Sequence, residues 1–152
     1  MRTLKRAEPN DFLDIAALDR IAWKDNPSAE FIPDGEHVWR VWVEHALVYV
    51  AKENDTLVGA VVAFPCLSGD FFLHKVFVDL NYRGQGIAPQ LFELLFSELD
   101  ESEGACSLTV DPVNESAIQL YTNWGFSQRE FVKGYYRDNE DRYVLTRPSR
   151  RA

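Results

Sequence analysis

The sequence predicts a mixed α/β domain, in which strands and helices neither alternate strictly nor form two separate blocks. The prediction depends on the order of amphipathic helical segments and short apolar segments, which is βα(α)βββαβαββ. No tract rich in Gly, Ser or Pro divides the 152 residues, and no internal repeat is present. A chain of this length buries roughly 70% of its unfolded surface when it folds as one domain. We therefore expect a single domain over residues 1–152, with the last few residues disordered.

The first part of the chain is expected to contain one strand and two helices. Residues 2–5 form the strand. Asn10 or Asp11 then caps a helix, because apolar residues recur near helical spacing directly after them. Residues 36–44 form the second helix, which carries several large apolar side chains.

Three strands follow in the middle of the chain, over residues 47–52, 57–64 and 71–78. The polar residues 53–55 make a tight turn between the first two. This succession of short apolar segments without an intervening helix indicates neighbouring strands of one sheet.

The last part of the chain returns to alternating helices and strands. Residues 87–99 have the apolar spacing of an amphipathic helix, and residues 106–111 indicate a buried strand. Asn114 caps a further helix, which Gly125 ends as a glycine after the last helical turn commonly does. The chain closes with an expected hairpin over residues 131–136 and 142–146.

Composition and charge exclude several functional classes. The chain has 24 acidic and 16 basic residues and a net charge of −8, the opposite of a phosphate-tracking nucleic-acid binder. Its longest nearly apolar stretch, residues 57–67, is about half of the roughly 20 residues that cross a bilayer. Cys66 and Cys106 lie far apart and indicate neither a disulfide framework nor a metal site. With no signal segment at the start, we expect a cytoplasmic protein that binds neither membranes nor metals.

A glycine-rich turn between a strand and a helix is the most informative segment. Residues 77–88 lead from a buried strand through Arg83, Gly84 and Gly86 into the helix. Glycines let backbone N–H groups converge, and the helix N-terminus adds partial positive charge, so the turn suits a phosphate or pyrophosphate. A P-loop would end in Gly-Lys-Ser/Thr, and a dinucleotide fingerprint would have a third glycine where Pro89 stands. The pattern Arg/Gln-x-x-Gly-x-Gly/Ala fits without a mismatch, and an ordinary strand-to-helix turn is the alternative.

Together with a second motif, this turn resembles the GNAT superfamily of acetyl-CoA-dependent N-acetyltransferases. Residues 83–88 match the pyrophosphate loop of that superfamily, and Asn114 with Tyr121 and the ending Gly125-Phe126 matches its later signature. The resemblance implies a GNAT-like α+β fold. That fold has a mostly antiparallel twisted sheet of six to seven strands, flanked by about four helices, with splayed central strands.

The resemblance also implies how acetyl-CoA would be held as co-substrate. Backbone groups of one strand would pair with the pantetheine arm, the loop would cradle the pyrophosphate with Arg83 at its lip, and Asn114 and Tyr121 would contact the rest of the arm. Pro89 departs from the pattern, because it lacks an N–H in the first helical turn. The cofactor-binding residues implied in this way are Val76, Phe77, Val78, Arg83, Gly84, Gln85, Gly86, Ile87, Ala88, Asn114 and Tyr121.

The implied reaction is direct attack of a primary amine on the thioester. Deprotonation at pH 7 costs roughly 4.6 kcal/mol for a lysine-like amine and roughly 1 kcal/mol for an α-amine. By position Tyr121 would be the general acid that protonates the CoA thiolate, with His74 or a water as the base. The spermidine/spermine acetyltransferase branch carries a Glu-Asp pair where this chain has His74-Lys75, which argues against a polyamine acceptor. The protein N-terminal branch often carries a glutamate at the position of Thr109, and this chain lacks that glutamate. Asp111 is a weaker alternative for the base.

The acceptor is left open between a protein N-terminal or lysine amine and a small-molecule amine. Tyr135 or Tyr136 would hold a peptide backbone, or else belong simply to the sheet. A catalytically silent acyl-CoA-binding sensor or interaction module is the alternative to an enzyme, and the resemblance also allows a homodimer. The aromatic residues expected either in the core or along the acceptor cleft are Trp23, Phe31, Trp39 and Trp42.

Overall fold

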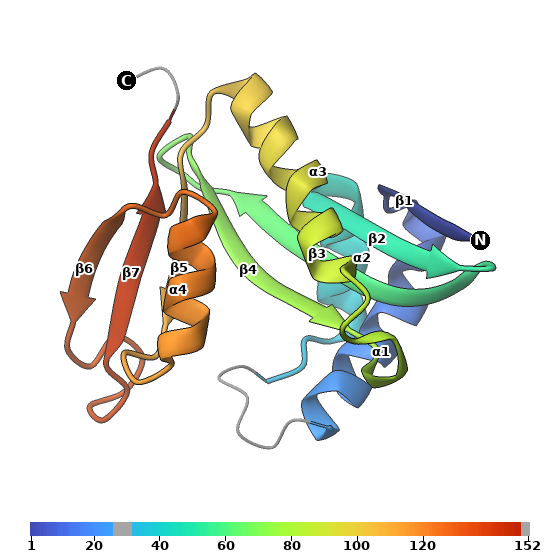
Figure 1. Ribbon diagram of the computed structural model, residues 1–152, viewed down its shortest axis with the longest axis horizontal. Helices are drawn as coiled ribbons and strands as arrows, with labels where there is room; N and C mark the ends of the chain where they lie inside the picture. Colours follow the sequence, from blue (N-terminus) through green and yellow to red (C-terminus); the bar gives the residue numbers. More distant parts are fainter. Residues whose placement is uncertain (26–31, 150–152) are drawn as a thin grey trace. The chain divides into compact units, whose positions relative to one another are not determined.

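The computed structural model describes residues 1–25 and 32–149, which form seven strands and four α-helices in the predicted order (Figure 1). The strand order in the sheet is β1-β2-β3-β4-β5-β7-β6. Pairing is antiparallel for β1–β2, β2–β3, β5–β7 and β6–β7, and parallel for β4–β5. The mixed α/β class, the mostly antiparallel sheet and the expected numbers of strands and helices are confirmed.

The chain divides into two compact units. The first consists of Met1–Phe64 and His74–Glu98, and the second of Pro65–Leu73 and Leu99–Ala152. Strand β4 (Phe71–Val78) therefore contributes residues to both units. The single domain expected from the sequence stays a prediction.

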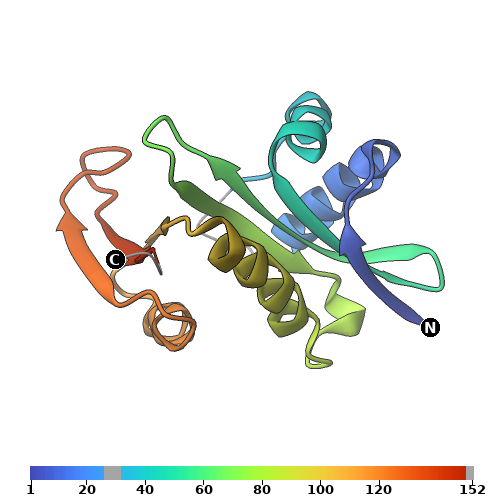
Figure 2. The same ribbon diagram turned by 90° about the horizontal axis from the view of Figure 1, so that it is seen from above.

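The sheet of the first unit is covered by helices on both faces. It consists of β1 (Arg2–Arg6), β2 (Leu47–Glu53), β3 (Thr56–Pro65) and most of β4. Figure 2 shows α1 (Phe12–Lys24) and α2 (Glu36–His45) on one side of these strands and α3 (Ile87–Ser102) on the other. Strand β3 is accordingly buried along most of its length rather than on alternate residues. The turn between β2 and β3 has positive φ at Asn54 (51°) and Asp55 (72°), the conformation that suits a two-residue hairpin.

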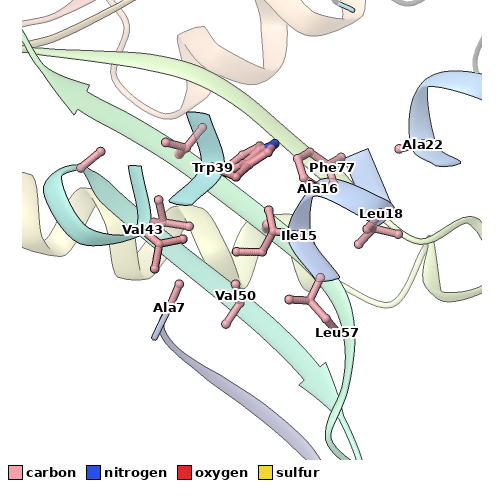
Figure 3. Packing of buried hydrophobic residues seen from close by; sticks show 14 residues of the cluster. Ala7, Ile15, Ala16, Leu18, Ala22, Trp39, Val43, Val50, Leu57 and Phe77 are labelled. Atoms are coloured by element: carbon pink, nitrogen blue, oxygen red, sulfur yellow. The ribbon is translucent and has the colours of Figure 1, made fainter. Parts of the chain in front are cut away.

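The core under α1 and α2 is built around Trp39. Its side chain is 0% exposed and packs edge-on against Trp42 at 5.1 Å and Phe77 at 5.9 Å between ring centroids. Figure 3 shows Trp39 beside Phe77, with Ile15 of α1 facing the same layer. Truncating a buried aromatic side chain of this kind costs about 3–5 kcal/mol, so this packing fixes α2 on the sheet. Trp39 is thus a core residue. This agrees with one of the two positions expected for it from the sequence, in the core or along the acceptor cleft.

Helix α1 begins where the sequence predicts, directly after Asp11, but the Asp11 side chain does not cap it. A 3₁₀ helix, η1 (Pro9–Asp11), precedes it, and Asp11 occupies the N-cap position. The Asp11 carboxylate turns back to accept the N–H of Glu8 at 2.8 Å and the Nζ of Lys52 at 2.8 Å. It therefore links the start of the helix to strand β2 instead of capping the first turn of α1.

The Asp11–Lys52 pair makes the stability of the first unit depend on pH in both directions. Burial raises the pKa of Asp11, but the hydrogen bond from Lys52 and the other contacts outweigh it, so the pKa lies below the ordinary 3.8. The hydrogen bond to Asp11 raises the pKa of Lys52 above its ordinary 10.5. The lowered pKa of Asp11 adds stability that is lost as the pH falls through the folded-state pKa of this carboxyl group. The raised pKa of Lys52 adds stability that is lost as the pH rises through the folded-state pKa of this ammonium group.

We therefore expect the loss of unfolding free energy caused by Asp11→Asn to be constant between about pH 5 and about pH 9. It should shrink below about pH 4 and again above about pH 10.5, because Asp11 or Lys52 is then neutral in the unfolded chain, and folding has to keep that group charged until the pH also passes its shifted folded-state pKa. Urea denaturation of both proteins across this range measures the difference. A loss that stays the same down to about pH 3 would contradict the contact.

The second unit holds the remaining strands and one helix. β5 (Cys106–Val110) pairs with β7 (Arg142–Arg147), and β7 pairs with β6 (Gln128–Val132). The β4–β5 ladder joins Phe71 to Cys106 and Phe72 to Ser107, the first residues of each strand. Helix α4 (Glu115–Asn123) is capped by Asn114, whose Oδ1 accepts the N–H of Ala117 at 3.2 Å. This cap is confirmed.

The first strand of the closing hairpin was predicted too far along the chain. It was expected over residues 131–136, whereas β6 is Gln128–Val132, and Gly134 lies in the following turn, where its N–H bonds to Asp141 Oδ1 at 2.8 Å. Strand β6 lies at the end of the strand order and is exposed at Gln128–Phe131, so its sequence lacks the apolar alternation that predicts a strand. The aromatic pair Tyr135-Tyr136 carries a strand-like signal but belongs to the turn region.

Two expectations fall outside the described residues. They are the place of Phe31 in the core or along the acceptor cleft, and the disorder of the last residues, 150–152. Within residues 1–25 and 32–149, no helix is long and apolar enough to cross a membrane. Over the same ranges, no group of three or more His, Cys, Asp and Glu side chains is arranged to hold a metal ion.

Candidate active site

The glycine-rich turn lies between β4 and α3 and is anchored at its start to the sheet. The N–H of Asp79 donates to the carbonyl of Val58 in β3 at 2.8 Å. The Asp79 side chain accepts the N–H of Asn81 at 2.9 Å and so caps the 3₁₀ helix η2 (Leu80–Tyr82). Residues 83–86 then lead into Ile87, the first residue of α3.

Gly84 and Gly86 shape a concave surface at the helix N-terminus. Their φ angles are +77° and +79°, in the left-handed region that residues with a Cβ rarely adopt. A hypothetical Cβ on either would meet nothing within 4 Å, so the glycines are required by backbone conformation rather than by lack of space. The turn borders a pocket of about 330 Å³ lined by Val78, Tyr82, Arg83, Gly84, Gly86, Ile87, Ala88 and Pro89. The first N–H groups of a 16-residue helix open here, which makes the pocket suited to an anion.

Gln85, at the centre of the turn, does not line the pocket and instead contacts Arg2 of strand β1. Arg2 Nη2 donates to Gln85 Oε1 at 2.6 Å, and Nη1 donates to the Gln85 main-chain carbonyl at 3.2 Å. Arg2 Nε donates to Glu53 Oε2 at 3.3 Å, from the residue that pairs with Arg2 across the β1–β2 ladder. Arg2 was not among the residues that the sequence indicated, because this contact joins residues 83 positions apart.

The three β4 residues implied for the pantetheine arm have different surroundings. Val78 lines the pocket, Val76 is half-buried, and the Phe77 side chain is buried in the core under α1 and α2. The side chains therefore build the sheet and the pocket wall. Pairing of their backbone groups with the cofactor stays a prediction.

His74 lies among aromatic side chains and a carboxylate. Its ring is 5.1 Å from that of Trp42 and 6.0 Å from that of Phe64, and its side chain is 30% exposed. Its Nε2 lies 3.0 Å from Asp34 Oδ2. Burial raises the pKa of Asp34, but the hydrogen bonds from His74 and Lys75 outweigh it and leave this pKa below its ordinary value. Asp34 is therefore an ionised acceptor for the His74 ring near neutral pH.

Lys75, the neighbour of His74, is buried in an ion-paired network. Its side chain and that of Asp19 are both 0% exposed, and Nζ lies 3.1 Å from Asp19 Oδ1 and 2.8 Å from Asp34 Oδ2. The Trp39 indole and the Asp34 N–H also donate to Asp19 Oδ2, at 3.1 and 2.8 Å. Adjacent strand residues point to opposite faces in a regular strand, yet both His74 and Lys75 reach Asp34. Asp34 and Asp19 thus tie the end of the α1–α2 connection to β4.

In the second unit, Tyr121 and Asn114 both belong to the α4 segment. The Tyr121 ring is half-buried and packs edge-on against Phe126, with centroids 5.7 Å apart. Thr109 of β5 and Tyr136 of the closing turn share a hydrogen bond of 2.8 Å between their hydroxyls. Tyr136 is also covered by the guanidinium of Arg142, 5.1 Å from its ring. The chemical roles of Tyr121 and Asn114 remain predictions.

Comparison with known proteins assigns the chain to a family. The sequence model of the Acetyltransferase (GNAT) family matches residues 15–126. An N-alpha-acetyltransferase of Saccharolobus solfataricus is 28% identical over 96% of this chain and 92% of its own length. An L-2,4-diaminobutyric acid acetyltransferase of Marinococcus halophilus is 42% identical over 47% of this chain and 44% of its own.

Among solved structures, the ribosomal-protein-S18-alanine N-acetyltransferase from Escherichia coli is similar in fold. Its TM-score is 0.78 at 23% sequence identity, and the match covers 98% of this chain and 94% of that one. The family match spans most of the chain, including the glycine-rich turn and the α4 segment. The chain belongs to the acetyltransferase (GNAT) family.

Proposed function

We propose that this acetyltransferase moves the acetyl group of acetyl-CoA onto the α-amine of a peptide or protein, by direct attack of the amine on the thioester. Acetyl-CoA is the co-substrate of the family to which the chain belongs. The observation that carries the proposal is the pocket at the N-terminus of α3. There Gly84 and Gly86, both at positive φ, border a space of about 330 Å³ suited to the pyrophosphate.

Direct attack is favoured over an acetylated cysteine. Burial raises the pKa of Cys106 to about 12, and burial also raises the pKa of Cys66. Cys106 is moreover fully shielded from solvent. Both thiols stay protonated near neutral pH, so neither is an activated nucleophile. In the proposed step the amine nitrogen forms the bond to the acetyl carbon, and the bond from that carbon to sulfur breaks.

Two protons move in this step, and we assign one to each candidate residue. Tyr121 donates its hydroxyl proton to the departing CoA thiolate. His74, or a water, takes the proton that the amine loses. Because the Asp34 carboxylate can only accept, His74 carries its hydrogen on Nε2 and presents the lone pair of Nδ1 for this purpose.

The α-amine is the acceptor best matched to a histidine base. Its deprotonation at pH 7 costs roughly 1 kcal/mol, against roughly 4.6 kcal/mol for a lysine-like amine. Where a polyamine acetyltransferase has two acids, this chain has His74 and the buried, ion-paired Lys75. The relatives that match nearly the whole chain include N-alpha-acetyltransferases of Saccharolobus solfataricus and Sulfurisphaera tokodaii. The diaminobutyric acid acetyltransferases match less than half of it.

Matched acceptors test this choice. One peptide has a free α-amine and no lysine, and a second has the same sequence with a blocked N-terminus and one internal lysine; 2,4-diaminobutyric acid and a polyamine complete the set. Mass spectrometry of each reaction with acetyl-CoA locates the product. We expect acetylation of the free α-amine. Acetylation confined to the lysine peptide or to a small amine would overturn the proposed acceptor while leaving acetyl transfer in place.

A further inference from the structure

We propose that Arg2 is a positioning residue for the acetyl-CoA site, which holds the glycine-rich turn in the conformation that binds the pyrophosphate. The turn contains two glycines at positive φ with Gln85 between them. Glycine backbones reach many conformations at little cost, so a turn of this composition needs an external contact to keep one of them. The Arg2 guanidinium supplies two such contacts, one to each oxygen of Gln85.

The contact to the main-chain carbonyl determines where the next amide points. A trans peptide is planar, and its C=O and N–H point in opposite directions. No peptide bond in the described residues is cis. With the Gln85 carbonyl directed at Arg2, the N–H of Gly86 is directed away from Arg2. Gly86 lines the pocket and Gln85 does not, so this orientation offers the Gly86 N–H to an anion there.

Arg2 is itself held in place by the sheet. Its Nε donates to Glu53 Oε2 at 3.3 Å, and Arg2 and Glu53 face each other in the β1–β2 register. Its side chain is mostly buried, with 22% exposed. The ion pair with Glu53 also neutralises the guanidinium locally, so Arg2 attracts the phosphates only weakly at long range. The role of Arg2 is therefore to orient the turn. A lysine cannot reproduce this role, because only the planar fork reaches two acceptors and Glu53 together.

The test is the dissociation constant for acetyl-CoA, measured by calorimetry on Arg2→Ala and Arg2→Lys. We expect both variants to bind acetyl-CoA about tenfold more weakly. This is the effect of losing one correctly oriented hydrogen bond to a charged group, here the bond from the Gly86 N–H to the pyrophosphate. Arg6→Ala is the matched control, because Arg6 is on the same strand and contacts Glu98 and the Ala46 carbonyl instead. It should bind acetyl-CoA as the wild type does. Wild-type affinity in Arg2→Lys would mean that charge alone matters, and would overturn the proposal.

A truncated substrate separates positioning of the pyrophosphate from a general loss of structure. Acetyl-pantetheine carries the same thioester but lacks the pyrophosphate and the nucleotide. We expect kcat/KM for acetyl-pantetheine to be the same in Arg2→Ala and the wild type. An equal loss on both thioesters would overturn the proposal in favour of a structural role.

Because acetyl-CoA binding at this turn is itself part of the proposed function, Gly86→Val serves as a reference variant. Its β-branched side chain cannot keep φ near +79°, so it should weaken acetyl-CoA binding whether or not Arg2 matters. If Gly86→Val binds normally, the proposed location of the site fails. If Gly86→Val binds weakly and Arg2→Ala binds normally, the role of Arg2 alone is excluded.

Discussion

Replacing Tyr121 by phenylalanine is expected to lower kcat by about 100-fold or more, because in the proposed mechanism the Tyr121 hydroxyl is the proton donor to the departing CoA thiolate. The substitution removes only the hydroxyl and keeps the ring that packs edge-on against Phe126 at 5.7 Å. Affinity for acetyl-CoA should therefore be nearly unchanged. Steady-state kinetics with a free α-amine peptide, together with direct binding of acetyl-CoA, measures both quantities.

Tyr143→Phe is the matched control for this prediction. Tyr143 also packs edge-on against a phenylalanine, Phe131, at 5.8 Å, but it lies on β7 and has no proposed role in the reaction. Its variant should keep wild-type kcat. The pH profile adds a second readout, since a tyrosine acid gives kcat a decline at high pH that Tyr121→Phe should lack. Equal kcat in Tyr121→Phe and Tyr143→Phe would exclude Tyr121 as the acid.

Replacing Lys75 by methionine is expected to have the largest effect on stability, a loss of about 3–5 kcal/mol. The variant leaves the Asp19 carboxylate fully buried without the cation that lies 3.1 Å from it. A loss of this size is a large part of the roughly 5–15 kcal/mol that holds a domain folded. Urea denaturation of the variant and the wild type measures the difference.

The double variant Asp19→Asn with Lys75→Met shows whether the loss comes from an unpaired charge. An asparagine oxygen can still accept the N–H groups of Trp39 and Asp34, so the double variant should recover much of the stability. Arg40→Met is the surface control, because its pair with Glu44 is exposed and spans one helical turn. It should cost no more than about 0.5 kcal/mol. A loss below about 1 kcal/mol in Lys75→Met would contradict the buried pair.

Local patterns in the sequence were sufficient to predict most of the fold. Apolar periodicity located four helices and six of the seven strands, and the glycine turn and the Asn114 cap were found from their residue types. The misplaced strand, β6, is an exposed strand at the end of the sheet. Its residues satisfy backbone pairing with β7 without burying apolar side chains, so no pattern of alternation marks it.

The side-chain network around the candidate site could not be predicted in the same way. Arg2–Gln85, Asp34–His74 and Asp19–Lys75 join residues 83, 40 and 56 positions apart, and only the folded sheet brings them together. One signal was available for the last pair. Lys75 stands between the buried residues Leu73 and Phe77, and Asp19 interrupts the apolar face of α1. A charge on a buried face requires a partner of opposite charge, although the sequence alone does not say which.

The most direct test of the central claim is the release of CoA thiol from acetyl-CoA in the presence of a peptide with a free α-amine. We expect release in proportion to enzyme and peptide, with one acetylated amine for each thiol released. Acetyl-CoA binding without amine-dependent release, across peptides, lysine, polyamines and amino acids, would contradict an enzymatic role. That result would indicate a protein that binds acyl-CoA without transferring its acyl group.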